Sequence, residues 1–381
     1  MKFKMKSVGP FKEIKMNING LTVLRGPSNS GKTRICKMLH ILLQASKLNW
    51  EGYIKDRIKH VIATTLLSAF PLYEEIPEQL IERLFYMYTS PELHDGKDVM
   101  DTIADFTPVL ITEMIKLLKE LEEMCNSCPK SMSDMLYSYF VDEHPIRNLN
   151  QKRTAIPTLS LKGNDINIEV SFDNDDLVGN VKNTSKNRAR RSFYLGNLKG
   201  FRMFEKFDGN YQYPKQIKDL IDDIYSGARI EYHDNNIYYH QSKGAKPISW
   251  NNLSSGLKAI LLLEIAYQNI QQGDTLILDN LDGMIHPEYQ IYFAKLVVLI
   301  QIYKKVNILL TTNSPYTLEA VKGYSKKYGN DLSLYKTERN DKHCNLINAS
   351  NTSQIYDDMF TPMQTIEDIK WDYILGRRKE I

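Results

Sequence analysis

Residues 26–33 have the spacing of a phosphate-binding loop. The segment Gly26-Pro27-Ser28-Asn29-Ser30-Gly31-Lys32-Thr33 fits the pattern G-x-x-x-x-G-K-[ST] at every fixed position. In this pattern the glycines let successive backbone N–H groups point at phosphate oxygens. The lysine reaches the β- and γ-phosphates, and the threonine hydroxyl ligates Mg²⁺. The residues predicted to bind the nucleotide here are Gly26, Asn29, Ser30, Gly31, Lys32, Thr33 and Arg34.

The flanking segments favour this prediction over a chance match in a turn rich in glycine and serine. Leu21-Thr22-Val23-Leu24 predicts a short buried strand before the loop. After the loop, Ile35, Met38, Leu39 and Leu42 recur at helical spacing. The phosphates would then lie at the N-terminus of a helix, where backbone N–H groups favour anions.

The composition is that of a globular protein with two or three domains. The chain has 381 residues, of which 42% are hydrophobic and 25% charged, and its net charge of +3 does not by itself imply nucleic-acid binding. We find no apolar run of about 18 residues, so we expect no membrane-spanning helix. The alternating N-terminal segment, residues 1–6, predicts a strand and not a signal peptide. Four cysteines in a chain of this length suggest the reducing cytoplasm.

Residues 46–154 predict an α-helical insertion. Apolar residues recur there at helical spacing in two sets, and polar residues occupy the opposite face of the second. The sets are Leu80, Ile81, Leu84, Phe85 and Tyr88, and Leu110, Met114, Leu117, Leu118, Leu121 and Met124. Packing against the body of the protein is the default explanation, and a partner-binding surface is the alternative. Cys125 and Cys128 form a lone C-x-x-C; zinc would need about two more ligands, so we expect two thiols at a helix end.

Two β-hairpins and a basic loop are predicted after the insertion. Residues 159–172 alternate around Lys162-Gly163-Asn164-Asp165, and residues 229–239 alternate around Asp234-Asn235-Asn236. The segment between them is rich in cations, and a solvated loop is its default interpretation. Contact with nucleic acid or another anionic partner is the alternative, helped by the nearby Phe193 and Tyr194. The cations of the loop are Lys182, Lys186, Arg188, Arg190 and Arg191.

Three further segments have the character of nucleotide-site motifs. Thr275-Leu276-Ile277-Leu278-Asp279 predicts an apolar strand that ends in a carboxylate suited to the Mg²⁺ shell. A similar strand, residues 309–315, ends in the polar tip Thr311-Thr312-Asn313-Ser314-Pro315. Before both, Leu253-Ser254-Ser255-Gly256 precedes a predicted helix and would present N–H groups to an anion. Alone, the Ser-Ser-Gly segment would indicate only a helix N-cap.

The order of these four motifs resembles the ABC-type ATPase head, and more closely the bacterial ATPases related to OLD, RecF and SMC proteins. The resemblance covers about 1–45 and 155–345, and Met5–Phe11, Asp279–Pro287 and Ser333–Lys336 through Tyr356–Pro362 look like further segments of the family. It implies an α/β fold, a mixed sheet flanked by helices with an antiparallel β subdomain and the helical insertion. The corresponding parts are 1–45, the N-terminal part of the head; 46–154, the insertion; and 155–381, the C-terminal part of the head.

The resemblance implies a role for each motif. Two heads would pair head-to-tail around ATP, with Thr33 and Asp279 holding Mg²⁺. The predicted contacts across the interface are Leu253, Ser254, Ser255, Gly256 and the D-loop residue Asp282. The predicted catalytic positions are Asp279, Asn280 and Asn313. The family's Q-loop glutamine has no confident counterpart here.

Two positions depart from the family pattern. The family usually has glutamate directly after the aspartate that corresponds to Asp279, but this chain has Asn280. At the switch position, at the tip of the second strand, the family usually has histidine, but this chain has Asn313. An amide orients water by hydrogen bonds but does not accept its proton, and the loss of a general base typically costs about 10²–10⁴ in rate. We therefore expect ATP binding and dimerisation with slow or absent hydrolysis, unless another carboxylate such as Asp282 acts as the base.

The resemblance implies a cytoplasmic, nucleotide-gated sensor or scaffold that controls a separately encoded nuclease or toxin in bacterial anti-phage defence. Self-association as a homodimer or higher oligomer follows from the same comparison. The main alternative is a DNA repair or maintenance ATPase of RecF or SMC type, which hydrolyses ATP and binds DNA. A nuclease with its own Toprim domain and a transporter ATPase fit less well, because the C-terminal segment lacks the required carboxylate cluster and the insertion is long.

Overall fold

The computed structural model describes residues 1–47, 146, 155–173, 178–185, 191–196, 208, 211–233, 236–242, 244–340, 343–349, 364–368 and 370–371. The chain divides into two compact units, Met1–Lys47 with Glu143–Ile381, and Leu48–Asp142. The predicted helical insertion, 46–154, lies outside the described residues except for Ser46, Lys47 and Ile146. Cys125, Cys128 and the predicted closing segment 356–362 also lie outside them.

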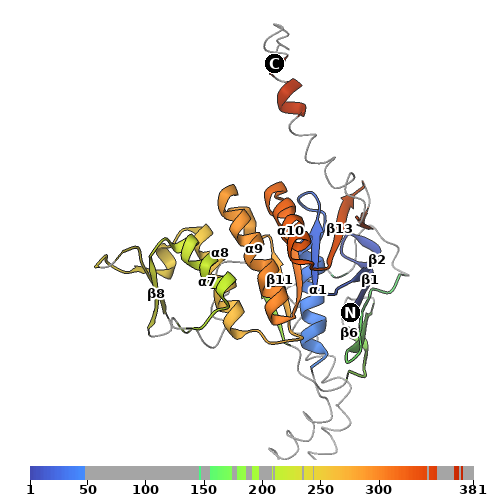
Figure 1. Cartoon of the computed structure of the whole chain (residues 1–381). Coiled ribbons are helices and arrows are strands. Elements are labelled where there is room, and N and C mark those ends of the chain that lie inside the picture. The colour runs from blue at the N-terminus through green and yellow to red at the C-terminus, as the bar shows by residue number, and fades with distance from the viewer. Residues whose placement is uncertain are drawn as a thin grey trace, which may run out of the picture. The chain divides into compact units, whose positions relative to one another are not determined.

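The described part of the head is built on one mixed sheet of eleven strands (Figure 1). Their spatial order is β6-β5-β4-β1-β2-β14-β13-β3-β12-β11-β7. Strands β13, β3, β12, β11 and β7 run parallel to one another, whereas β1, β2, β4, β5 and β6 pair antiparallel. The strand bounds are β1 Lys2–Val8, β2 Phe11–Asn17, β3 Leu21–Arg25, β4 Thr158–Lys162, β5 Asn167–Phe172, β6 Val178–Asn183, β7 Ser192–Leu195, β11 Thr275–Asp279, β12 Asn307–Thr312, β13 Leu332–Arg339 and β14 Cys344–Asn348.

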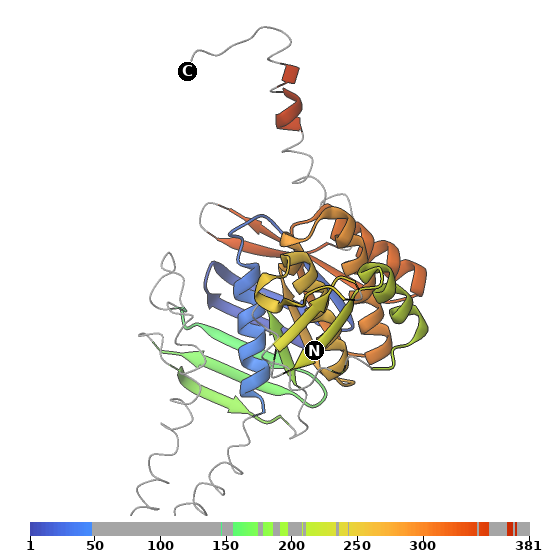
Figure 2. The same ribbon diagram turned by 90° about the vertical axis from the view of Figure 1, so that its left-hand side faces the viewer.

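Helices cover both faces of the parallel part of the sheet. Helix α1 packs against β7, β11 and β12, whereas α8 and α9 share a core with the opposite face of these strands (Figure 2). The helix bounds are α1 Lys32–Ala45, α7 Lys215–Tyr225, α8 Ser255–Asn269, α9 Pro287–Lys304 and α10 Pro315–Tyr328. The short 3₁₀ turns are η4 Trp250–Asn252 and η5 Leu281–Met284. The predicted α/β architecture with a mixed sheet is thus confirmed.

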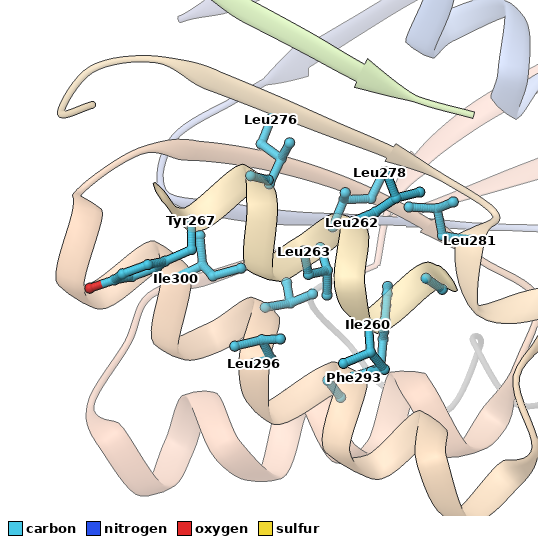
Figure 3. Close-up of a cluster of buried hydrophobic side chains, with 14 of the residues drawn as sticks. Ile260, Leu262, Leu263, Tyr267, Leu276, Leu278, Leu281, Phe293, Leu296 and Ile300 are labelled. Atoms are coloured by element: carbon cyan, nitrogen blue, oxygen red, sulfur yellow. The ribbon is translucent and has the colours of Figure 1, made fainter. Parts of the chain in front are cut away.

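Alternation along the strands decides which side chains meet the helices. Leu276 and Leu278 of β11 belong to the core formed with α8 and α9, where Leu263 and Phe293 are fully buried (Figure 3). Because successive side chains point to opposite faces of a sheet, Asp279 lies on the face covered by α1. The apolar pattern therefore fixes the side of the sheet on which the terminal carboxylate of β11 lies.

Both predicted hairpins are confirmed. β4 and β5 pair antiparallel with Lys162 opposite Asn167, within the large sheet. β8 (Arg229–His233) and β9 (Asn236–His240) pair antiparallel in a separate sheet with β10 (Ile248–Ser249). This smaller sheet immediately precedes α8 in the sequence, and Tyr239 and Ile248 pack against the core that contains α8.

Helix α8 buries one carboxyl group within an aromatic cluster. Glu264 is 5% exposed and accepts hydrogen bonds from the hydroxyls of Tyr213 at 3.0 Å and Tyr225 at 2.8 Å. Burial raises the pKa of Glu264, while the two tyrosine donors oppose the rise. The cluster satisfies a polar group that would be costly to bury alone.

Helix α1 contacts the edge strand β7 through a histidine. The His40 Nδ1 and Ser192 Oγ atoms lie 3.0 Å apart, and the His40 ring lies 5.8 Å from the ring of Tyr194. Burial, with a smaller contribution from the charge of Lys47, lowers the pKa of His40 from 6.5 to about 4. The imidazole is therefore packed in its neutral form.

This packing predicts a loss of stability in mild acid. Between about pH 6.5 and pH 4 the unfolded chain binds a proton at His40 that the folded chain does not, so the free energy of unfolding falls as the pH falls. We expect this group to contribute about 1–3 kcal/mol over that interval. Urea unfolding of the wild type and His40→Gln at pH 4.5–7.5 measures the effect, and the variant should show a shallower dependence. Parallel curves would contradict it.

Candidate nucleotide-binding site

The glycines of the P-loop are required by close neighbours. A Cβ at Gly26 would overlap the hydroxyl and carbonyl oxygen of Thr337 on β13. A Cβ at Gly31 would lie 2.6 Å from the ring of Phe11, and the φ of Gly31 is +86°. Asn29 also has a positive φ, +60°, a conformation that asparagine tolerates better than most residues. The loop is thus a tight cradle between β3 and α1, as the motif predicts.

A hydroxyl pair links the loop to β13. Ser30 Oγ donates to the carbonyl oxygen of Pro27 at 2.7 Å and lies 2.6 Å from Thr337 Oγ1. Thr337 Oγ1 in turn donates to the carbonyl oxygen of Arg25 at 3.2 Å. Ser30 was predicted to bind nucleotide, but Thr337 was not predicted at all, because only the pairing of β13 with β3 brings it to the loop.

Lys32 lies within the cradle. Its side chain is buried, and Nζ donates to the carbonyl oxygens of Gly26 and Pro27, both at 2.7 Å. Burial lowers the pKa of Lys32, and the nearby charge of Asp279 opposes that effect. Thr33 follows at an exposed position in the first turn of α1, and Arg34 is half-buried. A Cβ at Gly9 would lie 3.3 Å from Arg34, so Arg34 packs beside the β1–β2 turn.

Asp279 is held from both neighbouring strands. The side chain is 6% exposed. Its Oδ1 accepts from Thr311 Oγ1 of β12 at 2.7 Å, and its Oδ2 accepts from the hydroxyl of Tyr194 of β7 at 2.8 Å. In the sequence, Tyr194 stands out only as an aromatic neighbour of the basic loop. The strand order β12-β11-β7 brings it to the carboxylate.

The two amides in the predicted catalytic positions lie at the ends of adjacent strands. Asn280 is exposed with a φ of +56°, and its backbone N–H donates to Thr311 Oγ1 at 2.9 Å. Asn313 is exposed and directly follows β12. Because Asp279 pairs with Thr311 in the parallel register, both strands end at the same edge of the sheet.

A buried polar network joins the turn after β11 to the turn after β12. Asp282 has no exposed surface, and its Oδ2 accepts a hydrogen bond from Thr312 Oγ1. Gln290 Nε2 donates to the carbonyl oxygens of Asp282 at 3.0 Å and Ile285 at 2.9 Å, while its Oε1 accepts from Ser314 Oγ at 2.5 Å. Gln290 was not predicted, because it belongs to α9 and reaches the turns only through helix packing.

This network bears on the two roles considered for Asp282. Burial raises its pKa, and the hydroxyls of Thr312 and Thr317 oppose the rise. A carboxylate with no exposed surface is not placed to accept a proton from a water at the exposed edge, so the structure does not favour Asp282 as a substitute base. Its predicted role at an interface between two copies stays a prediction.

The Leu253–Gly256 segment forms the start of α8. Leu253 is buried, whereas the N-cap residue Ser254 is exposed and accepts from the backbone N–H of Leu257 at 3.3 Å. Ser255 and Gly256 are half-buried, and a Cβ at Gly256 would lie 3.8 Å from Ile285. In the described residues, Ser254–Gly256 make no hydrogen bond to the P-loop of the same chain. Their contact with a second copy stays a prediction.

The predicted basic surface is only partly described. Lys186, Arg188 and Arg190 lie outside the described residues, and Lys182 is exposed on β6. Arg191 bonds through Nε and an Nη to Oδ2 of the buried Asp274, at 3.2 and 3.0 Å. Its guanidinium therefore joins β7 to the start of β11 and is engaged within the chain. This role was not predicted.

The oxygen donors at this edge fit a magnesium nucleotide. The Thr33 hydroxyl and the Asp279 carboxylate are hard oxygen ligands of the kind that Mg²⁺ prefers. The described residues contain no group of three or more His, Cys, Asp and Glu side chains placed to hold a metal. Mg²⁺ in phosphate sites typically has one or two carboxylates and takes its other ligands from phosphates and water, so two protein donors suffice.

Residues 130–319 match a family model described as "AAA domain, putative AbiEii toxin, Type IV TA system". The match spans just under half of the chain and contains the α8, β11 and β12 motifs. No curated protein matches the chain significantly. With the sheet order and the P-loop geometry, the match shows an α/β P-loop NTPase fold and supports an AAA-type ATPase.

Several solved structures are similar to the chain at low identity. The SMC head domain from Thermotoga maritima is 12% identical with a TM-score of 0.43, covering 92% of this chain and 98% of that one. An SMC head bound to the C-winged helix domain of ScpA is 10% identical with a TM-score of 0.48, covering 93% and 98%. An SMC head with an extended coiled coil from Pyrococcus furiosus, bound to the C-terminal domain of ScpA, is 9% identical with a TM-score of 0.37, covering 97% and 98%.

The buried network around Asp282 predicts a graded loss of stability. Asp282→Ala leaves the buried Thr312 hydroxyl without its acceptor and should lower the free energy of unfolding by about 2–3 kcal/mol. Asp282→Asn keeps one acceptor oxygen, so its free energy of unfolding should fall by less. Asp219→Ala, at an exposed position of α7, is the control and should stay within about 0.5 kcal/mol of wild type. Urea unfolding measures all three, and equal values for Asp282→Ala and the control would contradict the network's role.

Proposed function

We propose that this protein binds ATP with Mg²⁺ between two copies of the chain and acts as a nucleotide-gated switch with slow or absent hydrolysis. One observation carries the proposal. The groups that would hold a triphosphate converge at one edge of the sheet, while the two positions that would activate water, Asn280 and Asn313, are both amides.

The binding half of the proposal rests on the loop and its neighbours. The loop amides at the start of α1 and the Lys32 cation would receive the phosphates. Thr33 and Asp279 would hold Mg²⁺, which would offset the negative charge of the phosphates. None of these groups is altered by the substitutions at 280 and 313, so tight binding and weak catalysis are compatible.

The switch half of the proposal rests on exposed groups around the same edge. Ser254 presents the start of α8 to solvent. Large apolar side chains are also exposed at the turns and helix starts after β11 and β12, with Met284 66% and Tyr316 53% exposed. Exposed apolar side chains near a nucleotide site favour a contact surface, and a second copy would cover them when ATP is bound.

The polar network supplies a means of coupling. Ser314 caps α10 and bonds to Gln290, and Gln290 bonds to the turn that holds Asp282. A change at the turn after β11 or at the turn after β12 would therefore move the starts of α9 and α10 together. We propose that this movement recruits or holds back an effector.

We propose a cytoplasmic role in bacterial anti-phage defence, with a separately encoded nuclease or toxin as partner. The description of the matching family names a putative toxin of a Type IV TA system, which supports a toxin–antitoxin setting; the anti-phage role and the separate effector come from the sequence resemblance. No helix in the described part of the chain is long and apolar enough to cross a membrane. A DNA-maintenance ATPase is less well supported, because Arg191 is engaged by Asp274 and such a role needs hydrolysis.

The first test is the particle mass. With ATP and Mg²⁺, size-exclusion chromatography with light scattering should show an increase in mass or a change in shape for wild type. Lys32→Ala, which lacks the cation that reaches the phosphates, should show none, and its unfolding curve serves as the folding control. A wild-type profile that ATP does not alter, with no binding of any nucleoside triphosphate by calorimetry, would contradict the proposal.

The second test is turnover. Wild type should hydrolyse ATP well below about 1 s⁻¹, because the two positions expected to activate water, Asn280 and Asn313, are amides that do not accept a proton. The double variant Asn280→Glu, Asn313→His restores groups able to accept or share a proton and should raise turnover by about 10²-fold or more. Phosphate release measures both, with Lys32→Ala as the background. Rapid wild-type turnover that requires Lys32 would contradict slow hydrolysis.

A further inference from the structure

The carboxylate of Asp279 receives one proton donor from each flanking strand. Thr311 Oγ1 accepts from the Asn280 N–H at 2.9 Å, so its own proton is directed to Asp279 Oδ1 at 2.7 Å. The Tyr194 hydroxyl donates its proton to Oδ2 at 2.8 Å. Both oxygens thus accept a hydrogen bond within the chain, and each keeps a second lone pair.

The ring of Tyr194 is fixed by its surroundings. Tyr194 pairs with Ile277 in the parallel register, which places it diagonally from Asp279 on the face covered by α1. The His40 ring of α1 lies 5.8 Å from it, between centroids. A Cβ at Gly196 would lie 2.5 Å from the phenol ring, so a side chain at position 196 would displace the ring. The hydroxyl is therefore held in position before any ligand binds.

We propose that Tyr194 is a positioning residue that orients Asp279 toward the divalent cation of a bound nucleotide. The inference rests on the proposed function for the cation itself, but the contact that carries it belongs to this chain. With one lone pair of Oδ2 occupied by the phenol, the rotation of the carboxylate about its Cβ–Cγ bond is fixed from the β7 side. Thr311 fixes it from the β12 side.

The magnitude of such an effect is known in general terms. Hydrogen-bond partners that orient a metal-ligating side chain typically change metal affinity by about 10- to 100-fold when removed. Tyr194→Phe removes only the hydroxyl and keeps the ring that packs against His40 and Gly196. The variant should therefore weaken the cation's contribution to nucleotide affinity and leave the affinity of the P-loop for the phosphates unchanged.

If the Tyr194 hydroxyl obstructed the cation, the effect of Tyr194→Phe on Mg²⁺-dependent binding would have the opposite sign. If the phenol occupied the space that the cation needs, its removal would strengthen Mg²⁺-dependent binding. The sign of the change in Tyr194→Phe separates positioning from obstruction.

The experiment is a titration of Mg²⁺ into protein with a fluorescent ATP analogue at fixed concentration, alongside a nucleotide titration in EDTA. We expect Tyr194→Phe to need about 10- to 100-fold more Mg²⁺ than wild type, with unchanged affinity in EDTA. Asp279→Asn shows how far the Mg²⁺ requirement rises when the carboxylate itself is lost. The matched control is Tyr213→Phe, which removes a tyrosine hydroxyl that donates to Glu264 in the α8 core and should leave both titrations at wild-type values.

Three results overturn the inference: an unchanged Mg²⁺ requirement in Tyr194→Phe, a lower one, or an equal loss in EDTA. An equal loss of affinity in EDTA would indicate that the Tyr194 hydroxyl has a structural role. Thermal unfolding of each variant detects such a role independently. Mn²⁺ in place of Mg²⁺ gives a spectroscopic readout, because the electron paramagnetic resonance signal of bound Mn²⁺ should broaden in Tyr194→Phe and not in Tyr213→Phe. Absence of nucleotide binding by wild type would instead count against the proposed function.

Discussion

The parallel register of β3, β12, β11 and β7 is the constraint on which the site depends. Parallel strands end at a common edge, so the P-loop after β3, the tip of β12 and the carboxylate of β11 arrive together without a dedicated scaffold. Alternation then selects the face. Because Leu276 and Leu278 must enter the core with α8 and α9, Asp279 is directed toward α1 and Lys32. Burial of apolar side chains on one face thus positions charged groups on the other.

The local parts of this arrangement were predictable from the sequence. The P-loop, the buried strands at 21–24 and 275–279 and both hairpins follow from spacing, alternation and turn residues. Thr337, Tyr194 and Gln290 were not predicted, because each reaches the site from an element distant in sequence, through strand order or helix packing. No local pattern marks a tyrosine in an edge strand as the partner of a carboxylate more than 80 residues away.

The same limit explains the charged residues whose surroundings the sequence did not reveal. Arg191 stands in a basic run, which indicates solvent or an anionic partner, yet its guanidinium bonds to the buried Asp274. The resemblance predicts that Asp282 lies at an interface between two copies, which stays a prediction; within the chain its carboxylate is enclosed by Thr312 and the turn it belongs to. In both cases a donor from another element hydrogen-bonds to a buried carboxylate, while Asp282 Oδ1 has no hydrogen-bond partner among the described residues.

The proposed function requires that the site retains its nucleotide without hydrolysing it. Its most direct test is the chemical identity of the nucleotide in an isolated complex. Wild-type protein incubated with ATP and Mg²⁺, separated from unbound nucleotide and held for an hour, should yield intact ATP at one molecule per chain in a particle of at least two chains. Recovery of ADP, or of single chains without nucleotide, would contradict the account.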